Sequence, residues 1–262
     1  MQQLEARNLN IKDFNYKNVR DHMPTFNFYT NPTLSIYASG LFILVGLLYI
    51  LLKNKEKEKL ALGDWTKIEF IGEDFSYQRI PVLKLNNCRF IQCNFKNALL
   101  QEVNTHHCLF DQCDFKNATM NSSTHKGSAF LNCRFENANL FVSIFEDCKM
   151  TGSSFGEADL SGVSIKGGDW SYTFLRNHHL KRCDLSGVLF KESDLYNCNF
   201  EKSNLRNADL SYANVSGVSF SGADLRGAIL DGIDLKSLNL KGTRIDIAQA
   251  IQLAHSFGAK VE

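Results

Sequence analysis

The residues with the most obvious chemical potential are the eight cysteines and seven histidines of this 262-residue chain. Cysteine thiolates and imidazoles are preferred ligands of zinc, and His106 and His107 directly precede Cys108. Zinc sites commonly use pairs such as Cys-x-x-Cys, however, and no such pair occurs in the sequence. We therefore expect no metal site, and the cysteines need another explanation.

The sequence also offers little to support catalysis. It has no glycine-rich phosphate loop, no His-Glu-x-x-His segment and no carboxylate pair that stands apart from the repeats. The net charge is +1, so bulk charge does not favour a strongly charged partner. We expect no enzymatic activity and no cofactor, and the sequence disfavours nucleic acid binding.

A five-residue period dominates the chain from Leu85 to Ile245. Every fifth residue in this range is apolar apart from Thr105 and His125, over 33 positions. Neither an α-helix, with about 3.6 residues per turn, nor a β-strand, with a side-chain period of about two, produces this pattern. We name this position i and expect it to point into the core of a repetitive fold.

The other positions of the repeat have preferences of their own. Position i−2 is mostly small, and all eight cysteines fall in it. Small thiols fill gaps in a packed core, which explains the cysteines without metal or disulfides. Position i−1 favours Asp or Asn and position i+2 favours Gly or Asn, which predicts one turn per repeat. His106 and His107 fall at i+1 and i+2, which face outward, away from the cysteines.

These positions combine into a recognisable motif. It is A-[DN]-[LF]-x-x, and it occurs as ADLSG, SNLRN, ADLSY, ANVSG and ADLRG. Over roughly residues 65–245 the sequence resembles the pentapeptide-repeat proteins. The resemblance implies an all-β solenoid, a right-handed quadrilateral β-helix with four repeats per coil. It also implies a C-terminal cap through which several members dimerise.

With four repeats per coil, side chains at the same position of successive coils stack at the spacing of neighbouring strands, about 4.8 Å. Phe90, Phe110 and Phe130 then form one aromatic column, and the phenylalanines from Phe95 to Phe155 form the next. The two exceptions, Thr105 and His125, become neighbours on successive coils. They form either a polar pocket or a distorted corner in which His125 bonds a hydroxyl or a carbonyl group. We favour the second interpretation.

A membrane segment precedes the repeats. Residues 34–52 are uncharged, and this length approaches the roughly 20 residues that span a bilayer core. Four lysines lie between Lys53 and Lys59, whereas the nearest basic residue before the segment is Arg20. The positive-inside rule then predicts a single-pass protein of the inner membrane, with the N-terminus outside and the repeats in the cytoplasm. A buried core helix is the alternative. Within the segment, a stripe of small residues suited to helix packing consists of Ser35, Ser39 and Gly46.

The predicted organisation has five parts. They are an N-terminal segment (1–33), a transmembrane helix (34–52), a basic linker (53–62), a β-helix (63–245) and a C-terminal helical cap (246–262). In the last part the five-residue period gives way to helical spacing of Ile247, Ile251 and Leu253. A homodimer through this cap or through the transmembrane helix is one predicted assembly.

Because the interior of a solenoid is filled, function is expected on its outer surface. Most outward positions are polar, but a group of apolar residues interrupts this pattern: Leu131, Phe141, Val142, Ile144, Tyr172 and Phe174. We interpret this group as an interface for a protein partner. The alternative is a local loop that folds over it.

Three functions follow as hypotheses. The first is a non-enzymatic interaction scaffold anchored to the membrane. The second is a membrane effector in phage defence, stress or host interaction. The third comes from the family resemblance, since some members protect topoisomerase by imitating DNA. Residues 63–262 carry a net charge of only about −2, which is a poor imitation of duplex DNA.

Overall fold

The computed structural model describes residues 64–80 and 84–262. The N-terminal segment (1–33), the transmembrane helix (34–52) and the basic linker (53–62) lie outside the described residues, as do Ser35, Ser39 and Gly46. Within the described ranges, no helix is both long and apolar enough to cross a bilayer. The repeats belong to the second of two compact units, which spans residues 58–262.

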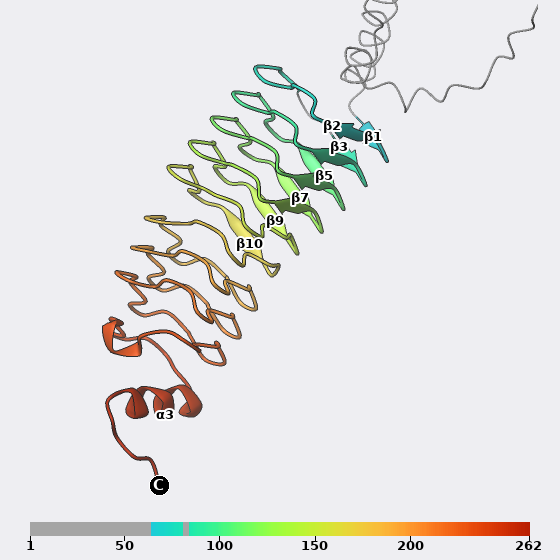
Figure 1. Ribbon diagram of the computed structural model, residues 1–262. Helices are drawn as coiled ribbons and strands as arrows, with labels where there is room; N and C mark the ends of the chain where they lie inside the picture. The colour runs from blue at the N-terminus through green and yellow to red at the C-terminus, as the bar shows by residue number, and fades with distance from the viewer. Residues whose placement is uncertain (1–63, 81–83) are drawn as a thin grey trace, which may run out of the picture. The chain divides into compact units, whose positions relative to one another are not determined.

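Short strands follow one another along the repeats, and a helix lies at the C-terminal end (Figure 1). The elements are β1 (Asp64–Thr66), β2 (Glu69–Ile71), β3 (Lys84–Asn86), β4 (Arg89–Ile91), β5 (Asn104–His106), β6 (Leu109–Asp111), β7 (Thr124–Lys126), β8 (Ala129–Leu131), β9 (Ile144–Glu146), β10 (Ser164–Lys166), η2 (Leu235–Ser237) and α3 (Ile247–Ser256). Parallel pairing forms a six-stranded sheet, β1-β3-β5-β7-β9-β10, and a four-stranded sheet, β2-β4-β6-β8.

The pairing register confirms the predicted β-solenoid. Leu85 pairs with Thr105, and Thr105 pairs with His125. Each of these steps along the chain equals four repeats, so one coil holds four repeats. Beyond the strands, single bridges with the same register join further pairs of coils, the last of them between Asp224 and Arg244. The right-handed sense stays an expectation from the family resemblance.

The predicted turns have a uniform geometry. At every described i+2 position from Lys67 to Gly232 the backbone has a positive φ. Asn and Gly adopt this conformation at little cost, which explains their preference for the position. The turns form the corners of the coil, and the position i residue lies between two corners.

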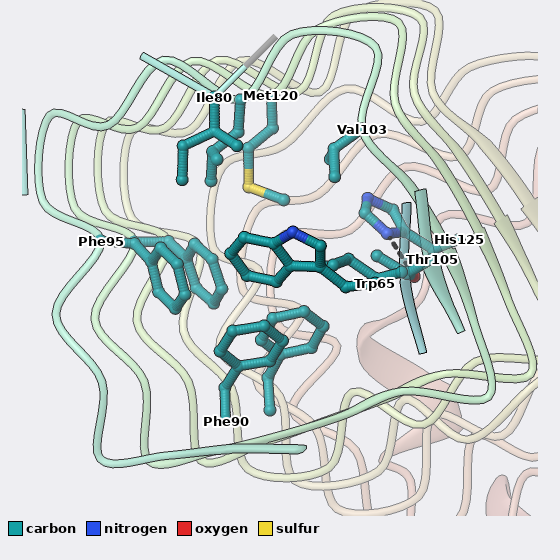
Figure 2. Close-up of a pocket in the computed structure, with 12 residues that line it drawn as sticks. Trp65, Ile80, Phe90, Phe95, Val103, Thr105, Met120 and His125 are labelled. Atoms are coloured by element: carbon teal, nitrogen blue, oxygen red, sulfur yellow. Dashed lines mark hydrogen bonds between the residues drawn. The ribbon is translucent and has the colours of Figure 1, made fainter. Parts of the chain in front are cut away.

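The inward columns come from four different sides of the coil. Figure 2 shows Phe90, Phe95, Ile80 and Thr105 pointing into the interior from these sides. Successive phenylalanine rings from Phe90 to Phe130 and from Phe95 to Phe155 stack 4.6–5.0 Å apart, with ring planes within 5° of each other. The predicted aromatic columns are thus confirmed.

The cysteines pack inside the coil, as predicted. All eight are free, and Cys183 alone is only half-buried. The thiols of six of them also donate hydrogen bonds to position i carbonyls of the preceding coil. Cys113 Sγ lies 3.3 Å from the Phe90 carbonyl oxygen, and Cys148 Sγ lies 3.3 Å from that of His125. These cysteines therefore satisfy carbonyl groups as well as filling space.

Helix α3 covers the C-terminal end of the solenoid. Its N-cap, Asp246, forms a reciprocal capping box with Gln249. Gln249 is buried, and its side-chain amide donates to the carbonyl oxygens of Leu225 (2.5 Å) and Ala228 (2.8 Å). The predicted short C-terminal helix is therefore present and satisfies carbonyl groups of the preceding repeats.

Candidate interaction surface

The polar exceptions in the core form a closed hydrogen-bond network. His125 Nδ1 lies 2.9 Å from Thr105 Oγ1, and His125 Nε2 lies 2.9 Å from Ser123 Oγ. Thr105 Oγ1 also lies 2.9 Å from Ser128 Oγ, and Ser123 Oγ lies 3.1 Å from Ser143 Oγ. Burial lowers the pKa of His125 to about 3, so the ring is neutral at physiological pH. These contacts support the favoured interpretation, in which His125 bonds neighbouring hydroxyls.

The cavity beside this network is small. It has a volume of about 20 Å³ and is lined by Thr105 and His125 together with apolar side chains such as Trp65 and Phe90 (Figure 2). A cavity of this size holds about one water molecule. It has no room for a substrate.

One serine matches the spacing of a hydrolase motif. Residues 152–156 read GSSFG, which fits Gly-x-Ser-x-Gly with Ser154 in the centre. In hydrolases this motif forms a strained turn between a strand and a helix. Here it is an ordinary repeat, and Ser154 donates to Glu136 Oε1 at 2.6 Å. The segment therefore lacks the setting of a nucleophile.

Metal ligands do not gather either. His106 and His107 contact each other edge to face, with ring centroids 4.1 Å apart, and both are exposed. Across residues 64–80 and 84–262, no three side chains of His, Cys, Asp or Glu are placed to hold a metal ion.

The predicted apolar group is divided by the coil geometry. Phe141, Val142 and Ile144 lie at one corner, and we name them patch A. Tyr172 and Phe174 lie six repeats later, which is one and a half coils, so they occupy the opposite corner. Leu131 is half-buried in β8 and belongs to neither group.

Patch A is accessible and strained. Phe141 is 47% exposed and Val142 is 40% exposed, so no loop of the described chain covers them. Ile144 is half-buried in β9. Val142 has a φ of +50°, a conformation that β-branched residues strongly avoid. The next coil places Gly162 beside it, where an added Cβ would come within 2.9 Å of Val142 Cγ1.

The opposite corner carries a second aromatic group, patch B, which consists of Tyr172, Phe174 and Tyr212; Tyr196 lies at the next corner along the coil. All four side chains are between 45% and 63% exposed. The Arg176 guanidinium lies over the Tyr196 ring, 5.6 Å from its centroid, and Tyr172 donates to Glu192 at 3.0 Å. Tyr196 and Tyr212 were not among the predicted interface residues, although Tyr212 is two coils from Tyr172 in the same register.

Two family profiles match this chain. The profile "Pentapeptide repeats (8 copies)" matches residues 84–124, and "Pentapeptide repeat region" matches residues 173–249. Both lie within the coils described above.

The chain is a pentapeptide-repeat protein. Among solved structures, a trypsin-treated variant of QnrB1, a plasmid-mediated fluoroquinolone resistance protein, aligns with a TM-score of 0.69 and 22% identity, covering 76% of this chain and 100% of its own. Full-length QnrB1 gives a TM-score of 0.59 and 20% identity, covering 75% and 100%. At such identities the likeness concerns the fold alone. No curated protein sequence matches this pentapeptide-repeat chain.

Proposed function

We propose that this pentapeptide-repeat protein is a non-enzymatic scaffold that binds a protein partner through patch A. The observation that carries the proposal is an exposed valine with positive φ beside an exposed phenylalanine. A strained backbone conformation of this kind costs on the order of 1–3 kcal/mol and is often found at functional sites. Burying large apolar side chains against a partner contributes about 1.5–3 kcal/mol each, which offsets that cost.

The filled interior supports the same conclusion. Position i and position i−2 side chains occupy the core throughout the described coils, and the cavity at the polar network measures about 20 Å³. A ligand therefore meets this protein on its outer surface.

The proposed location is the cytoplasmic face of the inner membrane. Its support is sequence alone: the uncharged segment of residues 34–52 followed by a lysine-rich one. A reporter fused after Glu262 tests the orientation. Activity of a reporter that works only in the periplasm would contradict it, and recovery of the protein in the soluble fraction would contradict the anchor.

The other hypotheses have less support. DNA imitation needs a strongly acidic surface, and residues 63–262 are close to neutral. The fold likeness to QnrB1 does not supply that charge. The membrane-effector hypothesis depends on Ser35, Ser39 and Gly46, which lie outside the described residues.

A double substitution tests patch A. Phe141→Asn with Ile144→Asp removes the apolar surface, and Phe174→Asn on the opposite corner is the matched control. We expect the double variant to lose its partner in membrane cross-linking while its melting temperature stays within a few degrees. A large fall in melting temperature would mean that the residues belong to the core, and the proposal would fail.

A further inference from the structure

The backbone ladder is interrupted in the middle of the solenoid. In the preceding coil, the Leu140 and Val142 N–H groups donate to the carbonyls of Asp159 and Ser161, both at 2.9 Å. In the following coil, Leu180 donates to Asn199 at 2.8 Å. Between residues 157–167 and 176–186, all in the described chain, no backbone hydrogen bond joins the two coils. We name this interruption the gap, and the six-stranded sheet ends there, at β10.

The gap extends over only half of the coil. On the other half, Phe155 N–H donates to the Phe174 carbonyl at 3.0 Å, and Trp170 N–H donates to the Leu189 carbonyl at 2.7 Å. We name the coils of residues 64–167 the N-terminal stack and those of residues 169–245 the C-terminal stack. The stacks are joined along one side and separated along the opposite side, which is the arrangement of a hinge.

A histidine lies at the start of the gap. His178 occupies an i−2 position where the coils before and after place Ala158 and Cys198. Its ring is buried, and Nε2 lies 2.7 Å from the Phe155 carbonyl oxygen. An imidazole needs more room between coils than a methyl group or a thiol, so His178 holds the coils apart. A groove of about 220 Å³ opens beside it, lined by residues including Asp159 and His179.

Two adjacent glycines, Gly167 and Gly168, lie at the other end of the gap. Gly168 has a φ of +90° at position i−2, where no other described repeat has a positive φ. A Cβ on Gly168 would come within 2.3 Å of the Cys148 carbonyl oxygen, so a side chain does not fit. The backbone thus changes course at the point where the ladder resumes.

The core remains closed across the gap. Leu160 and Ile165 on one side, and Leu180 and Leu185 on the other, are all buried. Only the backbone groups near the surface are separated. Completing the ladder therefore requires a small rotation of one stack and a displacement of the His178 ring, while these four side chains stay in the core.

We propose that the gap is a hinge with an open and a closed state, and that a partner bound at patch A shifts the balance between them. Patch A lies on the open side, one coil before the gap. One coil later, the residues in register with patch A are Ser161, Gly162 and Ser164. They form the edge of the gap on the N-terminal stack, which we name the first lip. Across the gap, the same corner of the next coil carries Lys181 and Arg182. They form the edge on the C-terminal stack, which we name the second lip.

A partner that covers patch A and reaches this second lip contacts both stacks. Its affinity then differs between the open and the closed state, and such a difference is what shifts an equilibrium. The partner's part in this inference rests on the proposed function, whereas the hinge does not.

Amide hydrogen exchange tests the hinge without a partner. We expect the amides of Leu160, Gly162 and Gly167 to exchange at least about tenfold faster than those of Leu140, Val142 and Asp147, one coil earlier. His178→Ala should bring the two sets within about threefold of each other, while Cys198→Ala, in the same column one coil later, should change neither. Equal exchange in the wild type would overturn the hinge. Unchanged exchange in His178→Ala would overturn the role of His178.

A photo-cross-linker at position 141 tests the coupling in intact membranes. We expect the cross-linking yield to differ at least about threefold between the wild type and the His178→Ala protein. Equal yields would overturn the coupling and leave patch A in place. A wild-type protein that forms no cross-link would contradict the proposed function instead, and with it the coupling.

Discussion

The two stacks share a register of four repeats per coil but differ in their cores. In the N-terminal stack, the phenylalanine rings from Phe90 to Phe130 and from Phe95 to Phe155 lie face to face at 4.6–5.0 Å, close to the spacing of the strands themselves. In the C-terminal stack leucines fill most columns, and the stacked pair Phe200 and Phe220 is 5.7 Å apart. Three-residue strands occur in the first stack, whereas single bridges predominate in the second.

This difference indicates which features of the sequence determine the register of four repeats per coil. The register of four repeats per coil persists in both stacks, so it depends on the turns and on an apolar residue at position i, and not on aromatic stacking. The change of core coincides with the gap. Trp170, in the Phe90 column, stacks on Phe155 at 5.5 Å and leaves its buried indole N–H without a hydrogen-bond partner. An unsatisfied donor of this kind costs about 1–3 kcal/mol, a sign of local compromise at the junction.

The largest expected effect concerns the aromatic columns. Phe115 is buried between Phe95 and Phe135 at centroid distances of 4.8 and 4.9 Å. Phe115→Ala should lower the free energy of unfolding by about 3–5 kcal/mol, measured by chemical denaturation. Leu195→Ala, in the same column of the C-terminal stack, is the comparison and should cost roughly 2–5 kcal/mol. A loss below about 1 kcal/mol for Phe115→Ala would mean that the columns do not support the first stack.

A second effect depends on pH. Burial lowers the pKa of His125 to about 3, whereas an unfolded histidine titrates near about 6.5. The contribution of the neutral His125 to the free energy of unfolding is therefore complete above about pH 6.5. It is lost as the pH falls below that value, and the loss reaches about 2 kcal/mol at pH 5. Burial also lowers the pKa of His178, which adds a loss in the same direction.

The matched comparison is His125→Gln, measured from pH 7.5 to pH 5. We expect a shallower fall of unfolding free energy in this variant, with the difference from wild type equal to the His125 contribution. Identical slopes would indicate that His125 is protonated in the folded protein.

Relief of the backbone strain at Val142 should increase the free energy of unfolding, by less than the changes above reduce it. Val142→Asn should raise the unfolding free energy by about 1 kcal/mol, because asparagine accepts the positive φ that valine avoids. The reverse change one repeat earlier, Asn137→Val, should lower it by about the same amount. A destabilised Val142→Asn protein would show that packing against Gly162 outweighs the backbone strain.

The smallest effect is expected for the cysteines. Cys113→Ala removes one buried sulfur atom and should cost about 1 kcal/mol. Burial raises the pKa of Cys148 to about 11, so its thiol should resist alkylation at neutral pH until the protein unfolds. Rapid labelling of native protein, or disulfides found without reducing agent, would contradict the packed arrangement.

Much of the fold was predictable because the same five-residue pattern recurs from Leu85 to Ile245. The position of His125 beside Thr105, the inward cysteines and the positive φ at i+2 all follow from a period of five and a coil of four repeats. The C-terminal helix was predictable from the change in period after Ile245.

The division of the predicted apolar group between two corners was harder to predict from the sequence. Val142 and Tyr172 both occupy position i+2, and only their separation of one and a half coils places them on opposite corners. The gap in the backbone ladder was harder still to predict. Its signals are a histidine in a small slot and a pair of glycines, which look like ordinary variation until the missing hydrogen bonds are seen.

The central claim is that the protein acts through patch A on its outer surface. A photo-reactive amino acid placed at position 141, and at position 174 as the control, tests this most directly in intact membranes. We predict a discrete cross-linked product from position 141 that disappears with Val142→Asn, in a protein at least as stable as the wild type. A product from position 174 alone, or one from position 141 that persists in Val142→Asn, would contradict the account.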